Sequence, residues 1–314
     1  MLRYLGKQFE TEICNSYRPF LAEEWSKKDT KEMFLVNCGQ GQIVQTESEL
    51  RLAESMTAQL GKRQTVAEVS VPDAKQKKAL PLRQLMGFYY ANGVNRVCFS
   101  KSPEEGIEEY YMRLGYFLGE GKQPVNTALF EPDEEACRMF SRHGIPYHVL
   151  TNLGMMKYGF VDEERIGCGK CTYDYLVLPS EAVLAEVPER MIRAFWEKGG
   201  KVLLLDRKPV YKNEPQKECA YLESTCTFGN IAAAQMYRLK NPETEVYSTY
   251  RNLNGMEFLY VANPSQRKTY QQTFDCGEKV HSFLKLDLME LVTERLSLTM
   301  TLKPGEDMVL IPYA

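Results

Sequence analysis

A single glutamate at the end of a predicted strand is the residue of this sequence best placed to do chemistry. Residues Gln64–Glu68 form a β-prone run that ends in this carboxylate, and the chain then breaks at Pro72. A second β-prone run, Gly93–Phe99, follows after a stretch with helical spacing. In an α/β barrel the carboxyl ends of the strands carry the catalytic groups. Glu68 is therefore the candidate catalytic residue, and the alternative is a surface glutamate that ends an ordinary strand.

A carboxylate in this position indicates glycosidase chemistry only if it has a partner. Glycosidases use two carboxyl groups, one to protonate the leaving oxygen and one to act as nucleophile or base. The partner is expected on an earlier strand, but the upstream glutamates lie in stretches without clear strand character. They are Glu10, Glu12, Glu23, Glu24 and Glu32. The second catalytic carboxylate, and with it a retaining or inverting outcome, is left open.

The CxxC motif formed by Cys168 and Cys171 is a second feature with chemical meaning. Such a pair is redox-active or forms half of a zinc site. Zinc needs about four ligands, however, and there is no second CxxC in the chain. The motif also precedes the predicted strand Tyr173–Pro179, whereas a thioredoxin-type motif opens a helix. We therefore predict two thiols in a hairpin or loop.

Histidine and glycine patterns indicate no metal and no cofactor. None of His143, His148 and His281 lies at metal-ligand spacing from another, and His148 falls inside a predicted strand, where a structural role is expected. The glycine-containing segments that begin at Gly39 and Gly167 match neither a phosphate loop nor a dinucleotide fingerprint. No Gly-x-Ser-x-Gly elbow is present.

The composition is that of an ordinary globular protein. The 314 residues are 44% hydrophobic and 26% charged, and the net charge of −3 gives no reason to expect nucleic acid or an anionic membrane as a partner. The sequence has no apolar run long enough to span a bilayer and no export signal at its N-terminus. The nine scattered cysteines are then expected to be reduced thiols, which predicts a cytoplasmic protein.

Three blocks of different patterning position these residues. In residues 1–121, predicted strands alternate with helical stretches, as in part of a (β/α) barrel. In residues 122–226, near-continuous apolar strands alternate with helices, which predicts a parallel sheet of the flavodoxin-like or class I amidotransferase-like kind. Residues 227–314 hold short β-prone segments between turns, which predicts an antiparallel β-sandwich. The expected fold class is therefore α/β with three parts.

Apolar periodicity and turn residues set the expected boundaries of these elements. Thr46 or Ser48 is expected to cap the first helix, and Asp133 the fourth. The predicted helices cover residues 48–61, 75–92, 104–119, 133–143 and 188–198. The predicted strands cover residues 33–37, 64–69, 95–99, 126–130, 147–150, 173–179, 201–206, 246–251, 257–263, 270–274, 282–286, 296–302 and 308–312.

Several ordered stretches resemble one enzyme family. They are residues 52–68, 85–96, 111–122, 145–150, 173–206 and 303–306. In this order they resemble the C-terminal part of an α-L-rhamnosidase-like glycoside hydrolase, family 106-like. The resemblance implies barrel, amidotransferase-like and terminal β-domains, with a carbohydrate as substrate. It carries over Glu68 as the one catalytic position. Asn95, beside the last of the barrel strands, and Gln40, in the segment Gly39–Gln42, are the predicted substrate-binding residues.

The chain departs from that family in its N-terminal part. About 120 residues precede the middle block, enough for two or three strand–helix units of an eight-fold barrel. Where the family has a histidine after the last barrel strand, this chain has Cys98, Phe99 and Ser100. A partial barrel leaves strand edges exposed, so we expect a partner chain or a second copy to complete it.

Three functional hypotheses follow. The first is a glycoside hydrolase, or a truncated portion of one, that acts on plant-type or bacterial polysaccharide glycosides. The second is a non-catalytic carbohydrate-binding or assembly protein derived from such an enzyme, in which Glu68 is incidental. The third is a redox or metal module based on Cys168 and Cys171.

Overall fold

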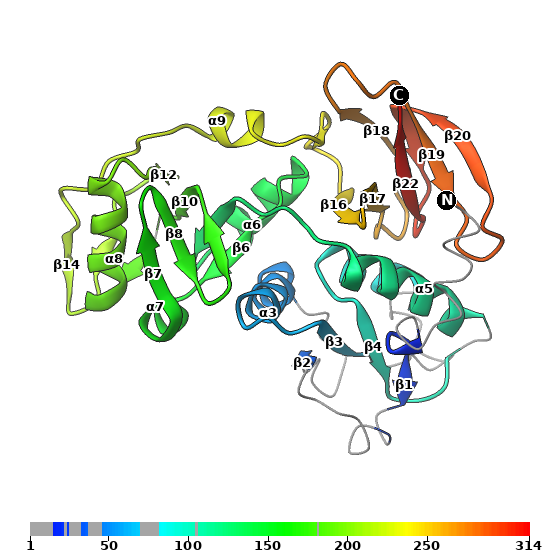
Figure 1. The fold of residues 1–314 in the computed structure, drawn as a ribbon, viewed down its shortest axis with the longest axis horizontal. Coiled ribbons are helices and arrows are strands. Elements are labelled where there is room, and N and C mark those ends of the chain that lie inside the picture. Colours follow the sequence, from blue (N-terminus) through cyan, green and yellow to red (C-terminus); the bar gives the residue numbers. More distant parts are fainter. Residues whose placement is uncertain are drawn as a thin grey trace.

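The chain forms a mixed α/β structure that combines parallel and antiparallel sheets (Figure 1). This computed structural model describes residues 15–21, 24, 33–36, 46–69, 82–103, 106–180 and 182–314. The α/β prediction is confirmed at this level. The described residues form no closed barrel, since their N-terminal parallel sheet has four strands. They also contain no helix that is long and apolar enough to cross a membrane.

The N-terminal sheet is parallel and joins the first described strand of the chain to a much later one. Its strands lie in the order β1-β4-β3-β2. The first described strand, β1, pairs in parallel with β4, the latest strand of this sheet in the sequence, as the first and last strands of a (β/α) barrel do. The sequence did not predict β1, which is two residues long. The strands are β1 (Phe20–Leu21), β2 (Met33–Val36), β3 (Gln64–Val69) and β4 (Arg96–Phe99).

Three helices pack against one face of this sheet. They are α3 (Glu47–Gln59), α4 (Leu82–Ala91) and α5 (Ile107–Glu120). Ala67 and Val69 of β3 share an apolar cluster with residues of all three helices. Thr46 caps α3 in a capping box with Glu49, so the sequence predicted both the helix and one of two candidate caps correctly.

The middle part contains a second parallel sheet, in the order β12-β10-β5-β6. If these four strands are numbered along the chain and the order is read from β6, it becomes 2-1-3-4, which matches the start of the 2-1-3-4-5 order of one type of doubly wound sheet. Its strands are β5 (Thr127–Phe130), β6 (His148–Leu150), β10 (Tyr175–Leu178) and β12 (Lys201–Leu204), and its helices are α6 (Glu134–Arg142), α7 (Asn152–Tyr158) and α8 (Glu186–Glu197). Asp133 caps α6 as predicted, and Gly144 follows its end with a positive φ of 66°.

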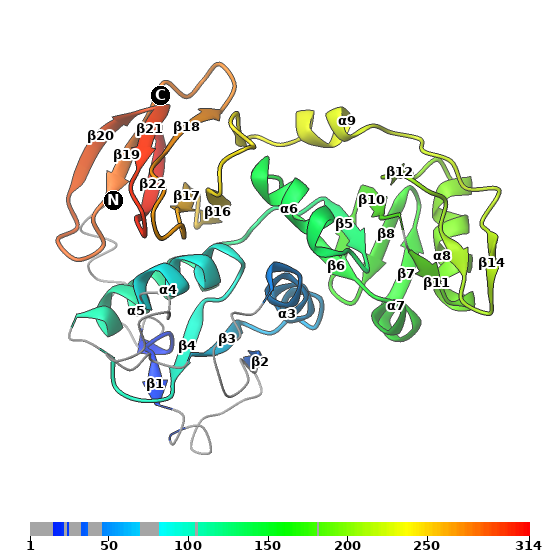
Figure 2. The same cartoon turned by 180° about the vertical axis from the view of Figure 1, so that it is seen from behind.

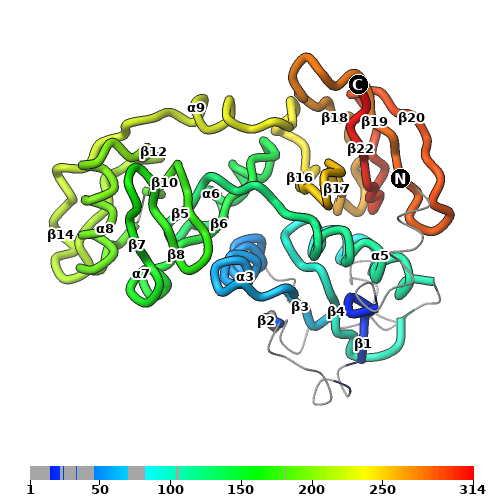
Figure 3. The backbone as a smooth tube through the Cα atoms, in the orientation of Figure 1, coloured from blue at the N-terminus to red at the C-terminus, as the bar shows by residue number. Residues whose placement is uncertain are grey.

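Two small sheets and a short helix complete this part. The CxxC motif joins two strands of an antiparallel sheet in the order β7-β8-β9, which confirms the predicted hairpin. These strands are β7 (Gly159–Asp162), β8 (Arg165–Cys168) and β9 (Cys171–Tyr173). The other elements are β11 (Val183–Leu184), β13 (Val210–Tyr211), β14 (Glu214–Glu218) and α9 (Phe228–Ala233). Figure 3 shows the segment with α9 leading from the middle part to the C-terminal sheets.

The C-terminal part consists of two antiparallel sheets that share one apolar cluster. The first has the order β16-β17-β22-β19-β20, and the second β15-β18-β21. Their strands are β15 (Arg238–Leu239), β16 (Tyr247–Leu253), β17 (Met256–Ala262), β18 (Tyr270–Asp275), β19 (Ser282–Leu286), β20 (Thr293–Ser297), β21 (Thr299–Leu302) and β22 (Asp307–Tyr313). Asn254 and Gly255, both with positive φ, turn the chain between β16 and β17.

One predicted strand of this part is wrong. Residues 296–302 do not form a single strand, because the chain changes sheets at Leu298. Before that residue β20 pairs with β19 of the first sheet, and after it β21 pairs with β18 of the second. Strands that turn a corner in this way connect packed sheets.

The N-terminal and C-terminal parts share a core. Seen from behind in Figure 2, α4 and α5 lie against β16 and β17. Phe258 and Tyr260 of β17 belong to the same apolar cluster as the helices of the N-terminal sheet. The boundaries at residues 121 and 226 stay predictions, and this shared cluster indicates that the first and third parts fold together.

Candidate functional site

Glu68 lies near the carboxyl end of β3, on the face of the sheet that points away from α3, α4 and α5. Side chains alternate between the faces of a strand. Ala67 and Val69 pack on the helices, whereas Val66 belongs to a small cluster on the opposite face. Glu68 shares that face with Val66, is partly buried, and pairs in register with Cys98 of β4.

An arginine ties three strands together on this face. Arg96 begins β4, and its guanidinium donates to Gln64 Oε1 at 3.1 Å and to the backbone oxygen of Arg18 at 2.9 Å. It also lies over the ring of Phe20, 4.6 Å from the centroid. Burial lowers the pKa of Arg96 to about 10, so it remains a cation at neutral pH. The face that carries Glu68 therefore holds polar and charged groups beside the small apolar cluster of Phe20, Val66 and Cys98.

Glu24 is a second carboxylate at the carboxyl ends of these strands, the end of the sheet where Glu68 lies. Its Oε2 accepts a hydrogen bond from the backbone N of Leu21 at 2.9 Å, which holds it just beyond β1. Burial, together with the charges of Glu68 and Glu24, raises the pKa of the Cys98 thiol to about 11. The two carboxylates therefore flank the strand that carries Cys98, with Glu24 just after β1 on one side of β4 and Glu68 on β3 on the other. Two carboxyl groups at the carboxyl ends of parallel strands can serve acid–base chemistry.

Glu24 was one of five glutamates that the sequence offered as a partner for Glu68. The other four, Glu10, Glu12, Glu23 and Glu32, lie outside the described residues. The sequence gave no preference among them because β1 is too short to produce a periodic signal. The useful signal would have been the apolar pair Phe20–Leu21, which comes shortly before Glu24 in the sequence.

The structure describes only one of the two predicted substrate-binding residues. Gln40 lies outside the described residues. Asn95 is 7% exposed, and its amide is already bonded to the neighbouring strand: Oδ1 accepts from Thr65 N at 3.0 Å and Nδ2 donates to Arg63 O at 3.1 Å. It precedes β4, at the opposite end of the strands from Glu68, and the strand rise puts about 10 Å between them. Its backbone hydrogen bonds give it a structural role, and substrate binding by Asn95 stays a prediction.

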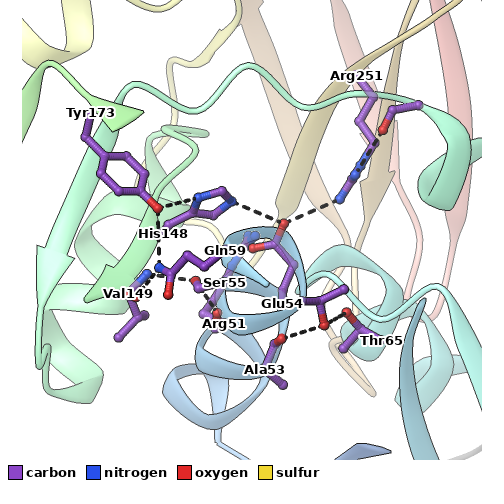
Figure 4. A network of polar contacts seen from close by, with 12 residues as sticks. Arg51, Ala53, Glu54, Ser55, Gln59, Thr65, His148, Val149, Tyr173 and Arg251 are labelled. Carbon is purple, nitrogen blue, oxygen red and sulfur yellow. Dashed lines mark hydrogen bonds and ion pairs between the residues drawn. The ribbon is translucent and has the colours of Figure 1, made fainter. Parts of the chain in front are cut away.

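A buried polar network connects the three parts of the chain, with Glu54 of α3 at its centre (Figure 4). Glu54 Oε1 lies 3.7 Å from His148 Nε2 of β6 and 3.8 Å from an Arg251 terminal nitrogen of β16. All three side chains are nearly inaccessible to solvent. Two further residues of α3 reach the same strand: Ser55 Oγ accepts from Val149 N, and Gln59 Nε2 donates to Val149 O.

The charges of this network hold one another ionised. Burial opposes ionisation of Glu54, but His148 and Arg251 lower its pKa. Burial likewise opposes protonation of His148, but Glu54 and Cys171 raise its pKa to about 9. His148 Nδ1 also lies 3.0 Å from the hydroxyl of Tyr173. The predicted structural role of His148 agrees with its position in this network, which is closed to solvent and joins separate sheets.

The CxxC hairpin contacts the edge of this network. Cys168 and Cys171 face each other across the two-residue turn, and Cys171 interacts with His148 and Tyr173. Burial and the neighbouring Cys171 raise the pKa of Cys168 to about 11, which disfavours the reactive thiolate. No group of three or more metal-binding side chains occurs in the described part of the chain.

Comparisons with known proteins identify the fold. No family model matches the sequence, and no curated protein is significantly similar to it. Among solved structures, a rhamnosidase from Novosphingobium sp. PP1Y matches with a TM-score of 0.65 and 12% identity, over 90% of this chain and 34% of that one. An exo-carrageenase GH42 from Bacteroides ovatus matches with a TM-score of 0.54 and 10% identity, over 84% of this chain and 43% of that one.

A β-galactosidase from Bacillus circulans sp. alkalophilus matches with a TM-score of 0.50 and 10% identity, over 89% of this chain and 60% of that one. This chain therefore spans about a third of the rhamnosidase and less than two thirds of the other two proteins. At such low identity the likeness shows the fold alone. The chain has a fold similar to part of these glycoside hydrolases.

Proposed function

We propose that this chain is a portion of a glycoside hydrolase, with Glu68 as one of the two carboxylates that cleave the glycosidic bond. The observation that carries the proposal is the position of two carboxylates at the carboxyl ends of one parallel sheet: Glu68 near the end of β3, and Glu24 just beyond β1. That edge carries the catalytic groups in barrels built from such strands. The glycoside hydrolase-like fold supports the same assignment.

In this mechanism Glu68 and Glu24 divide two tasks between them. One carboxylic acid protonates the oxygen of the leaving group, while the other carboxylate activates water or attacks the anomeric carbon. The guanidinium of Arg96 supplies a positive charge on the same face of the sheet. We propose α-L-rhamnosides as the first substrates to try, since a rhamnosidase is the structural relative with a TM-score of 0.65.

We further propose that a second chain completes this sheet. Among the described strands, β1 and β2 are the outer ones. Unpaired edges of a parallel sheet favour pairing with another chain. Either a separately encoded piece or a copy of this chain would supply the strands. Sedimentation velocity of the purified chain distinguishes a monomer from a homodimer, and activity that needs an added N-terminal piece would identify the first arrangement.

Hydrolysis of a panel of 4-nitrophenyl glycosides, with the α-L-rhamnoside first, tests the catalytic proposal. Turnover should be lost in both Glu68→Gln and Glu24→Gln, because each variant removes one of the two required carboxyl groups. Glu186→Gln, an exposed glutamate on α8, is the matched control and should be unchanged. Full activity in Glu68→Gln, measured beside this control, contradicts the proposal.

A non-catalytic carbohydrate-binding role is the second candidate. The observation in its favour is that the described sheet has four parallel strands instead of a closed barrel. In this case the purified chain binds sugars, as measured by isothermal titration calorimetry, but hydrolyses none of them with or without a partner chain. Glu68→Gln would then leave sugar affinity unchanged.

A further inference from the structure

A cavity of about 360 Å³ lies where the three parts of the chain meet, apart from Glu68. Its walls come from the start of α3, from α4, from α6 and from the segment that leads into β16. Glu68 does not line it, and α3 and α4 cover the opposite face of the N-terminal sheet from Glu68. A volume of this size is typical of small-molecule sites, which often form between domains.

Two arginines supply positive charge to this cavity. Arg138 and Arg142 lie four residues apart on α6, so they project from the same side of the helix. Both are exposed, and neither forms an ion pair or a hydrogen bond within the described part of the chain. Guanidinium groups that are free to form paired hydrogen bonds are suited to a carboxylate.

The side-chain amide of Gln84 is a buried polar group in the wall of this cavity. Gln84 of α4 lines the cavity and is 8% exposed. Its Nε2 donates to Ser265 O at 3.2 Å, but no donor among the described residues reaches its Oε1. A buried acceptor without a partner is costly. Because Oε1 is closed to solvent, the amide of Gln84 has to turn toward the cavity before a hydroxyl group of a bound molecule can donate to it.

The remaining walls suit the rest of a sugar ring. Phe88 and Tyr247 pack edge to face, with centroids 5.5 Å apart, and offer an apolar surface for C–H groups. Glu47 is buried, and both of its carboxyl oxygens already accept hydrogen bonds from protein donors, namely Ser141, Tyr147 and Tyr247. Burial raises its pKa, which disfavours a negative charge at this wall. Glu245 at the rim interacts with Tyr270, and its carboxylate remains able to accept from a ligand hydroxyl.

From these features we infer that the cavity binds an acidic sugar, that is, a small polyol bearing one carboxylate. The carboxylate would bind Arg138 and Arg142, and the apolar face of the ring would lie against Phe88. A hydroxyl would donate to Gln84 Oε1 once the amide turns toward the cavity. This site is separate from the glycosidase proposal, since none of its residues belongs to the Glu68 edge of the sheet.

Isothermal titration calorimetry with D-glucuronate as the probe tests this inference. D-Glucose is the neutral control ligand, and inorganic sulfate is the control for charge alone. Because charge-assisted hydrogen bonds are among the stronger ones, Arg138→Gln and Arg142→Gln should each weaken glucuronate binding by roughly ten-fold or more. Arg190→Gln on α8, an exposed arginine in the same part of the chain, is the matched control and should leave binding unchanged.

The expected pattern is glucuronate binding that exceeds glucose and sulfate binding by roughly ten-fold or more and survives in Glu68→Gln. Gln84→Leu should weaken glucuronate and leave the weak sulfate binding as it is, because only the sugar donates to Gln84. The inference is overturned if glucuronate does not bind, if glucose or sulfate binds equally well, or if Arg138→Gln and Arg142→Gln behave like Arg190→Gln. Loss of binding in Glu68→Gln would overturn its separation from the catalytic proposal.

Discussion

The chain contains two parallel sheets of four strands each, and their faces are filled differently. In the middle sheet, Phe130 and Leu150 pack into one apolar cluster, and Leu129 and Val149 pack into another on the opposite face. In the N-terminal sheet one face is apolar and joins the helices, but the described part of the other carries a cluster of three fully buried apolar residues together with charged and amide groups.

This difference separates a structural sheet from a candidate functional one. A sheet sandwiched between two apolar layers offers no face to a polar substrate and leaves only the ends of its strands open. A face that keeps Gln64, Glu68 and Arg96 forgoes some hydrophobic stabilisation and leaves charged groups near the strand ends. Such a departure from the apolar pattern is expected where chemistry is done. Substitutions in either sheet, or in the Glu54 network that connects the parts of the chain, test this difference.

The largest effect is expected at the strand ends. Glu68→Gln should reduce glycoside hydrolysis by about 10²–10⁴-fold, the usual contribution of one acid–base group. Glu131 provides a comparable position, since it directly follows β5 of the middle sheet and Glu68 lies one residue before the end of β3. Steady-state kinetics of Glu131→Gln should show kcat/KM close to wild type. Equal losses in the two variants would mean that the two sheets do not differ in function.

The next effect concerns the network that joins the sheets. Glu54→Gln leaves His148 and Arg251 buried without their counter-charge, which should cost about 3–5 kcal/mol of unfolding free energy. Urea unfolding followed by circular dichroism measures this change. Glu135→Gln, an exposed glutamate on α6, is the control and should stay within about 0.5 kcal/mol of wild type. A Glu54→Gln variant as stable as this control would show that the ion pairs contribute nothing net.

The same network predicts a dependence on alkaline pH. The folded-state pKa of His148 is raised from 6.5 to about 9, so its charge stabilises the folded protein fully below pH 6.5. This contribution should decline as the pH rises and be lost above pH 9. Thermal unfolding from pH 6 to 10 should therefore show a steeper loss for wild type than for His148→Gln. Parallel curves for the two proteins would contradict the assignment.

Sequence patterns predicted the helices and strands well, but they did not predict the side-chain contacts between segments that are far apart in the sequence. The strands around Val66 and Val177 and the helix caps Thr46 and Asp133 follow from periodicity and local hydrogen bonding, which the sequence displays directly. The partner of Glu68 could not be chosen, because Glu24 is positioned by a two-residue strand paired across more than seventy positions. The role of Glu54 also went unnoticed, since a buried carboxylate on a helix is distinguished only by partners from other sheets.

The smallest effect should come from Asn95, and it decides between two roles for that residue. If Asn95 is structural, Asn95→Ala leaves the backbone N of Thr65 and the O of Arg63 without their partner and costs about 1–3 kcal/mol of stability. KM for an aryl glycoside should then stay near the wild-type value, because the side chain lies at the amino end of β4, away from Glu68. A raised KM with unchanged stability would instead support the predicted contact with substrate. Measuring both quantities on one variant is decisive, because a structural amide lowers the unfolding free energy and a substrate ligand alters binding.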